Sequence, residues 1–337
     1  MKAWQYSKTA GGLEKNLTLQ NAVPVPRLPT NPSTTQLLIQ VLSTSINPVD
    51  YKAPETGFLS RIVFGSPATP GTDFCGRVVR TAGPADERAG FDVGDLVFGR
   101  TGFQQHGTTG EYTTTPAKNV ARLPDGVSPD DAAAVGVAGF TAYQSIVPHV
   151  KAGDKVFING GSGGTGTFGI QIAKLLGCHV TVSCSPGKAD LCRSLGADEL
   201  IDYNSTDVSA ALKAKGQVFT LVVDNVGSPA SLYKAANDFL QPTGRFVQVG
   251  AGLDAHSVKT ITPRLLRPAF LGGGKRKYEL FVMRPNREDL KQLGTWIADK
   301  KIRVVIGETY EFGDVPKAFE KLKTGQTMGK LVIHVGK

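Results

Sequence analysis

A glycine-rich segment, GGSGGTG at residues 160–166, separates a strand-like apolar run from a stretch with helical spacing. The run KVFI precedes it, and GTFGIQIAKLLG follows it. Side chains in such a turn would keep the backbone away from a pyrophosphate or keep the helix off the strand. The segment therefore predicts a βαβ unit that binds a dinucleotide through the helix N-terminus, and the alternative is a tight turn without a ligand. The residues expected around the pyrophosphate are Ser162, Gly163, Gly164, Thr165 and Gly166.

Strand and helix patterns alternate strictly from residue 155 to residue 251. Strands are expected at 155–160, 179–185, 219–227 and 244–251, with helices at 166–177, 188–197 and 231–240. Such alternation predicts a parallel sheet that is covered on both faces. The first 120 residues instead show short strands broken by Gly and Pro, which indicates a mainly antiparallel β-domain. A helix is expected at 129–147 and another at 287–300, before β-character returns near the C-terminus.

Composition and length narrow the class of protein. A chain of 337 residues with 40% hydrophobic and 20% charged residues fits a globular protein of about two domains. Charge, Gly or Pro interrupts every apolar run, so no membrane span is expected. The N-terminus shows no targeting signal, and we expect a cytoplasmic protein. The four cysteines and five histidines show no metal-binding spacing, so no metal site is expected.

The end of the expected strand at 179–185 indicates which dinucleotide binds. NAD-preferring proteins carry an acidic residue there to bind the adenine ribose. This chain has VSCSPGK, with Ser183, Ser185 and Lys188 and no acid. Hydroxyl and ammonium groups bind a 2′-phosphate by charge-assisted hydrogen bonds, and a carboxylate would repel it. The sequence therefore predicts NADPH in preference to NADH.

Several motifs together resemble the medium-chain dehydrogenase/reductase superfamily, specifically its zinc-free quinone oxidoreductase and enoyl reductase branch. They are SINPVDYK (45–52), PGTDFCG (70–76), GFTAYQSI (139–146), GGSGGTG (160–166), CSPGK (184–188), IDYNS (201–205), DNVGS (224–228) and MGKLVI (328–333). The resemblance covers essentially the whole chain. It implies an α/β fold in which a doubly wound Rossmann domain, residues 122–284, is inserted in a mainly antiparallel GroES-like catalytic domain, residues 1–121 and 285–337.

The resemblance also implies positions for the cofactor-binding residues. Ser185, Lys188 and Tyr203 match positions around the 2′-phosphate and adenosine. Asn225 matches the loop near the nicotinamide ribose. Thr141 and Gly250 match positions beside the nicotinamide, and Leu271 matches a backbone contact to the carboxamide. A structural role is the alternative for each, with equal weight for Thr141 and Leu271.

In the zinc-dependent relatives, a Cys and a Gly-His-Glu segment supply metal ligands. Here Asn47 stands in place of the Cys, and Gly71-Thr72-Asp73 replaces Gly-His-Glu. These residues offer no soft or imidazole ligand, so a zinc-independent reaction is expected. Asn47, Asp50 and Lys52 resemble the active-site wall, with Lys52 as the group that stabilises the substrate oxygen. Asp50 has a structural role as its alternative. Phe58 stands where related enoyl-thioester reductases carry a proton-donating Tyr.

The expected reaction is hydride transfer from NADPH to a conjugated carbonyl: a quinone, an enone, or an enoyl thioester of CoA or a carrier protein. The apolar residues Phe58, Leu59, Ile62 and Phe64 favour a hydrophobic small-molecule substrate. The resemblance also implies a homodimer. Two alternatives stay open: a redox-silent cyclase or isomerase, and an NADPH-sensitive RNA-binding protein, which the net charge of +9 would suit. The chain has no RNP-like strand or dense arginine patch, so nucleic acid is the weakest alternative.

Overall fold

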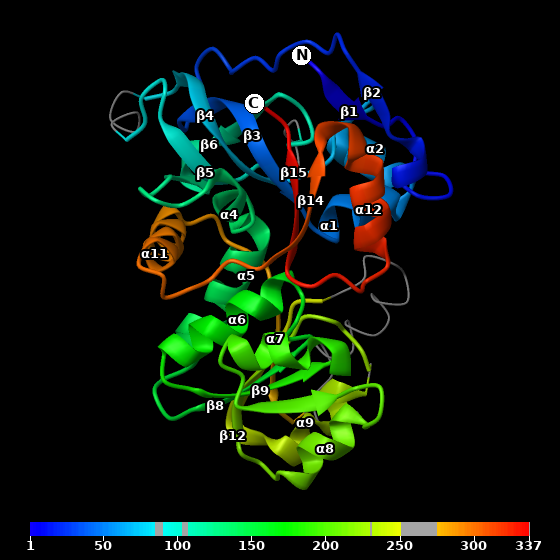
Figure 1. Cartoon of the computed structure of the whole chain (residues 1–337), viewed down its shortest axis with the longest axis vertical. Coiled ribbons are helices and arrows are strands. Elements are labelled where there is room, and N and C mark those ends of the chain that lie inside the picture. The colour runs from blue at the N-terminus through cyan, green and yellow to red at the C-terminus, as the bar shows by residue number, and fades with distance from the viewer. Residues whose placement is uncertain (85–89, 103–106, 230, 251–274, 337) are drawn as a thin grey trace. The chain divides into compact units, whose positions relative to one another are not determined.

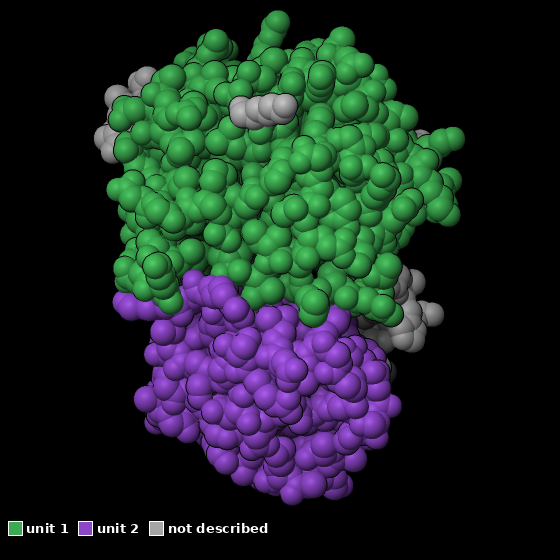
Figure 2. All heavy atoms as spheres, in the orientation of Figure 1, with its two compact units in different colours: residues 1–140, 285–300, 304–337 green, residues 141–284, 301–303 purple. Residues whose placement is uncertain are grey.

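The chain forms two compact units (Figure 2). A computed structural model describes residues 1–84, 90–102, 107–229, 231–250 and 275–336. The first unit comprises residues 1–140, 285–300 and 304–337, and the second comprises 141–284 and 301–303. The domain limits expected from the sequence stay a prediction, because compactness alone does not delimit domains.

The second unit is built on a parallel sheet, whose described strands lie in the order β10-β9-β8-β11-β12-β13 (Figure 1). They are β8 (Lys155–Asn159), β9 (His179–Cys184), β10 (Glu199–Asp202), β11 (Phe219–Asp224), β12 (Leu240–Gln248) and β13 (Lys277–Leu280). The chain runs outward from β8 to β10 and then returns to the other side of β8 with β11. Ligands of such sheets bind at this reversal, beyond the carboxyl ends of the strands.

Helices cover both faces of this sheet. On one face, α6 (Gly164–Leu175) lies so close to β8 that a Cβ on Gly169 would be 3.3 Å from the Ile158 side chain. On the other face, α8 (Val208–Ala214) and α9 (Leu232–Phe239) share an apolar core with Phe157, Val222 and Phe246. Neighbouring residues of β8 thus point to opposite faces. The unit also contains α7 (Ala189–Ser194) and the 3₁₀ turns η4 (Val147–His149) and η5 (Pro186–Lys188).

The first unit contains a mainly antiparallel sheet in the order β14-β15-β3-β4-β5-β7 among the described strands, with β6 also paired to β3. They are β3 (Gln36–Ile46), β4 (Asp73–Ala82), β5 (Leu96–Arg100), β6 (Tyr112–Pro116), β7 (Val120–Arg122), β14 (Ile306–Glu311) and β15 (Lys330–His334). Strands β1 (Ala3–Gln5) and β2 (Thr18–Gln20) form a separate antiparallel pair. Strand β15 connects the C-terminal segment to β3, because Leu331 pairs with Ile46.

Short helices surround this sheet. They are α1 (Val49–Lys52), α2 (Phe58–Phe64), α4 (Pro129–Ala133), α11 (Arg287–Ala298), α12 (Val315–Lys323) and the 3₁₀ turns η1 (Glu14–Asn16), η2 (Pro54–Thr56), η3 (Ala117–Asn119) and η7 (Phe312–Asp314). Helix α12 packs its buried Phe319 against Trp4 and Ile333 in one apolar core. No helix in the described ranges is long and apolar enough to cross a membrane.

The single helix expected at 129–147 is divided in two. Helix α4 ends at Ala133, and α5 (Gly136–Ile146) begins after a short break. The cause is a long-range contact: Val137 N donates a hydrogen bond of 2.7 Å to Asp73 Oδ1. A Cβ on Gly136 would lie 2.3 Å from the same oxygen. The carboxylate thus pairs with a backbone N–H at the start of α5.

The predicted α/β class, with a parallel Rossmann sheet and an antiparallel sheet, is confirmed. Each strand and helix expected between residues 155 and 251 has a counterpart in the second unit. The sequence patterns did not predict β10, α8 or α12.

Candidate active site

The glycine-rich segment forms a tight turn between β8 and α6. Gly160 adopts φ +82°, a left-handed conformation that favours glycine. A Cβ on Gly166 would lie 2.2 Å from the carbonyl oxygen of Gly160, so only glycine lets α6 approach the strand this closely. No side chain caps the N-terminus of α6 at Gly163, and its first N–H groups can therefore face an anion. The turn and the start of α6 contain all the predicted pyrophosphate residues: Ser162, Gly163, Gly164, Thr165 and Gly166.

Beyond β9, the structure brings together the residues predicted to bind the adenosine end. Ser185 and Lys188 lie on the turn that follows β9, and both are half-buried. Tyr203 is 52% exposed, and its N–H donates to the carbonyl oxygen of Cys184 at 3.4 Å. Asp202 pairs with Cys184 across the strands, but its carboxylate accepts hydrogen bonds from its own turn, including one of 2.7 Å from Ser205 Oγ.

Ser183 differs from its predicted role at the phosphate site. Its side chain is only 1% exposed. The Oγ atom accepts a hydrogen bond of 2.9 Å from Gly160 N and donates one of 2.5 Å to Asn159 Oδ1. The Ser183 hydroxyl therefore links the glycine turn to Asn159 in the interior of the unit and is not directed toward a ligand.

Asn225, predicted to lie near the nicotinamide ribose, directly follows β11. Its Oδ1 and Nδ2 atoms are both buried without a hydrogen-bond partner. Buried amide groups without partners cost free energy, so a ligand that pairs with them would be favoured. Gly250 lies against this loop, where a Cβ would be 2.2 Å from the carbonyl oxygen of Asn225. Thr141 lies in α5 and is 4% exposed, and Leu271 lies outside the described residues. The glycine turn and the unpaired amide together fit a dinucleotide.

In the first unit, a buried polar cluster forms where β3 ends and β4 and β15 begin. Asn47 Nδ2 donates to Asp73 Oδ2 at 2.8 Å. Lys330 Nζ donates to Asn47 Oδ1 and, at 3.1 Å, to the carbonyl oxygen of Ile46, and it lies 3.4 Å from Asp73 Oδ2. Asp73 is fully buried and Lys330 is 3% exposed. The ammonium and the carboxylate thus share the carboxamide of Asn47 as a bridge.

Asp50 joins this cluster through the backbone. Its Oδ2 atom accepts a hydrogen bond of 2.7 Å from Asn47 N, while Oδ1 is buried without a partner. Burial and the negative charge of Asp73 raise the pKa of Asp50 to about 7. The Lys330 charge opposes this shift. Burial also lowers the pKa of Arg100, although the charges of Asp73 and Asp50 oppose that shift.

Two of the three predicted catalytic residues are buried in this cluster, and the third is exposed. Asn47 and Asp50 are both 4% exposed and lie in the cluster. The amide of Asn47 is used internally, because Nδ2 also lies 3.4 Å from Thr72 Oγ1. Lys52 ends the short helix α1 and is exposed. Helix α2 carries exposed apolar side chains nearby in sequence, with Ile62 at 69% and Val63 at 45%.

A zinc ion does not fit this cluster. Of Asn47, Thr72 and Asp73, only Asp73 has a common zinc-ligand side chain, and its carboxylate lies beside an ammonium group. In the ranges that the structure describes, no group of three His, Cys, Asp or Glu side chains could hold a metal.

Sequence reasoning missed Lys330, although a signal was available. A lysine that opens the apolar run KLVIH at 330–334 is buried if that strand is internal, and a buried lysine needs an acidic partner. The acid in TDFCG at 72–76 could have been recognised as that partner. Asp73 had been identified only as the replacement of a metal ligand.

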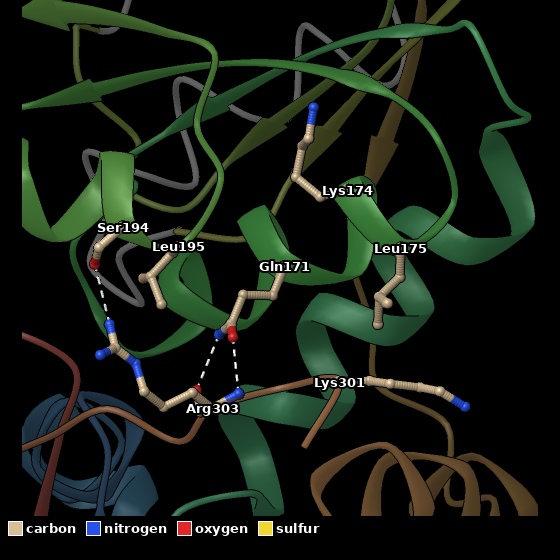
Figure 3. Close-up of a pocket in the computed structure, with 7 residues that line it drawn as sticks. All are labelled: Gln171, Lys174, Leu175, Ser194, Leu195, Lys301 and Arg303. Atoms are coloured by element: carbon tan, nitrogen blue, oxygen red, sulfur yellow. Dashed lines mark hydrogen bonds between the residues drawn. The ribbon is translucent and has the colours of Figure 1, made fainter. Parts of the chain in front are cut away.

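The second unit also contains a cavity of about 490 Å³ beside α6 that includes none of the predicted residues (Figure 3). The side chains of Lys174 and Lys301 point in different directions (Figure 3). Lys174 is paired with Asp198 at 2.9 Å. Gln171 donates to the carbonyl oxygen of Arg303 and accepts from its N–H. This cavity therefore marks where segment 301–303 attaches to α6, and its cations do not converge on a ligand.

Replacing Lys330 tests the importance of the buried cluster. Lys330→Met should lower the free energy of unfolding by about 3 to 5 kcal/mol, because Asp73 would remain buried without its cation. Lys213→Met is the matched control, since it removes an exposed pair with Asp238 that is worth about 0 to 1 kcal/mol. Denaturant unfolding measures both. Equal losses for the two variants would contradict the assignment.

Asp50 should make stability depend on pH. Its folded pKa of about 7 exceeds the model-peptide value of 3.8, so the folded state binds the proton more tightly. Stability should therefore fall as pH rises between these values, by at most about 4 kcal/mol from this group. Asp50→Asn keeps an acceptor for Asn47 N and removes the charge. The variant should gain stability relative to the wild type between pH 5 and pH 8, measured by unfolding at each pH. A pH-independent difference would show that Asp50 does not titrate in this range.

Comparisons with known proteins agree with these observations. The alcohol dehydrogenase GroES-like domain model matches residues 33–125, and the zinc-binding dehydrogenase model matches residues 195–333. A trans-enoyl reductase of Aspergillus terreus is 46% identical over 350 residues, which cover 99% of this chain and 96% of the relative.

Solved structures extend the similarity to the whole fold. The quinone oxidoreductase from Coxiella burnetii has a TM-score of 0.84 at 29% identity, covering 100% of this chain and 99% of the other. A mycobacterial protein solved in complex with NADPH has a TM-score of 0.75 at 25% identity, with 99% of both chains covered. This chain therefore belongs to the medium-chain dehydrogenase/reductase superfamily and is an oxidoreductase of the enoyl and quinone reductase type.

Proposed function

We propose that this protein is a zinc-independent, NADPH-dependent reductase that transfers hydride to a conjugated carbonyl compound. The observation that carries the proposal is the pairing of a glycine turn with the Ser185 and Lys188 side chains beyond β9. The segment that follows β9 offers a hydroxyl and an ammonium to a 2′-phosphate and has no acid before Asp190. The similar mycobacterial protein was solved with NADPH, which supports the same choice of cofactor.

The substrate class follows from the relatives and from α2. A trans-enoyl reductase and a quinone oxidoreductase both act on electron-poor conjugated systems, in keeping with an enone, enoyl thioester or quinone substrate. Exposed Ile62 and Val63 on α2 favour a hydrophobic substrate.

The residues of this chain would divide the work as follows. NADPH, when bound, supplies the hydride. Lys52 donates a hydrogen bond to the substrate carbonyl oxygen and stabilises the negative charge that develops there. Asn47 and Asp50 act on Lys52 indirectly: the hydrogen bond from Asn47 N to Asp50 Oδ2 fixes the start of α1, which ends at Lys52. With Lys330 and Asp73 bonded to Asn47, this anchor is rigid.

Lys188→Ala tests the cofactor preference. The variant should bind NADPH at least about tenfold more weakly, because the loss of one charge-assisted contact costs about 1.5 to 3 kcal/mol. Its affinity for NADH should stay unchanged. Fluorescence titration with both cofactors measures this. The matched control is Arg193→Ala, which removes an exposed cation from neighbouring α7. If both variants lost NADPH affinity to the same extent, the effect would come from the net positive charge of the region and not from a specific contact of Lys188.

Lys52→Ala tests the proposed catalytic group. It should lower kcat by about 100-fold, the effect of removing one donor to a developing oxyanion, with NADPH affinity unchanged. Steady-state kinetics with an enone or quinone substrate, together with cofactor titration, separates the two quantities. Lys118→Ala removes another exposed lysine of the same unit and serves as control. Equal losses in turnover and in cofactor affinity would contradict the assignment.

A further inference from the structure

A buried polar network joins the carboxyl ends of β8 and β11, where the strand order reverses. Asn159 ends β8 and Asp224 ends β11, and they are 4% and 2% exposed. Asn159 Nδ2 donates to Asp224 Oδ1 at 2.8 Å and to the carbonyl oxygen of Ser228 at 2.8 Å. One side chain thus connects the end of β8 to both ends of the loop that follows β11.

The network reaches the glycine turn on one side. Asn159 Oδ1 accepts from Ser183 Oγ, and Ser183 Oγ accepts from Gly160 N. The first residue of the turn is therefore connected to Asp224 through two intervening side chains.

On the other side, the network reaches the loops that contain Asn225 and Gly250. Asp224 Oδ1 accepts from Val226 N at 3.1 Å and from Gly227 N at 2.9 Å. Gln248 Nε2 donates to Asp224 Oδ2 at 3.1 Å and to the carbonyl oxygen of Gly250 at 2.7 Å.

The directions of these hydrogen bonds require that the side chain at position 224, at the centre of the network, acts only as an acceptor. Asp224 accepts from four donors, namely Asn159 Nδ2, Val226 N, Gly227 N and Gln248 Nε2. A carboxylate accepts at both oxygens, whereas an asparagine side chain would turn an N–H group toward one of these donors. The aspartate thus matches its surroundings, and an amide of the same size does not.

We infer that Asp224 is a positioning residue of the cofactor site, because its carboxylate holds the glycine turn, the loop after β11 and Gly250 in their binding arrangement. The inference rests on the proposed function. The loops that it holds include the predicted pyrophosphate and nicotinamide-ribose residues. Ser185, Lys188 and Tyr203 lie beyond β9 and β10, and the hydrogen bonds of the network described above run between other residues. Asp224 should therefore matter for the pyrophosphate and nicotinamide parts of the cofactor and little for the 2′-phosphate end.

The test compares binding of NADPH with binding of adenosine 2′-monophosphate, which lacks the pyrophosphate and the nicotinamide. Asp224→Asn should raise the Kd for NADPH at least about tenfold and change the Kd for the fragment less than about twofold. Ser183→Ala, a milder change that breaks the link to Gly160, should raise the Kd for NADPH about fivefold with the fragment again unchanged. Calorimetric titration measures NADPH binding, and NMR titration measures the fragment.

Two control variants define the outcomes. Lys188→Ala should weaken both ligands, since both carry the 2′-phosphate, and Asp238→Asn removes a carboxylate paired on the surface and should weaken neither. If Asp224→Asn and Ser183→Ala weaken both ligands equally, or weaken neither, the inference is overturned. If Asp224→Asn does not fold, Ser183→Ala decides alone by the same criterion. Failure of the wild type to bind NADPH would instead overturn the proposed function.

Discussion

In both units, hydrogen bonds between polar side chains that are buried at the ends of strands hold the loops of the candidate site. A polar group without a partner in such a place costs a large part of the stability of a domain. In the second unit, Asp224 accepts hydrogen bonds from four donors, which lie at the end of β8, in the loop after β11 and at the end of β12. In the first unit, the amide of Asn47 is satisfied by Asp73 and Lys330. Helix α1, which ends at Lys52, begins two residues after Asn47, and Asn225 directly follows Asp224.

The cluster around Asn47 also explains why the reaction can be proposed without zinc. Asn47 is hydrogen-bonded to Thr72 and Asp73, and Lys330 Nζ donates to Asn47 and Asp73. The Nζ atom of Lys330 lies 3.4 Å from the Asp73 carboxylate, and the residue is only 3% exposed, so it is not accessible from solvent. The proposed mechanism therefore assigns the polarisation of the substrate carbonyl to an exposed group, Lys52 at the end of α1.

Local sequence patterns predicted the class of fold and most strands and helices of the second unit. The features that they did not predict depend on contacts between residues far apart in the sequence. The alternation from KVFI to GRFVQVG predicted the parallel sheet because strands buried on both faces are almost continuously apolar. The break before Gly136 depends on Asp73, far away in the sequence, and no local pattern could reveal it. Ser183 and Ser185 look alike in the sequence, yet Ser183 lies within β9 and donates to Asn159, whereas Ser185 lies in the turn after the strand ends at Cys184. Asp73 lies beside Lys330 because β15 pairs with β3 and β3 pairs with β4, which joins segments far apart in the sequence.

The most direct test of the proposed reaction follows the hydride itself. The purified protein is given NADPH carrying deuterium at the transferable C4 position, with enones, enoyl thioesters and quinones as substrates and NADH in parallel. The account predicts NADPH consumption well above that of NADH and one deuterium on the β-carbon of each reduced enone or enoyl product. Product formed without cofactor consumption and without label would contradict the account and would favour a redox-silent cyclase or isomerase.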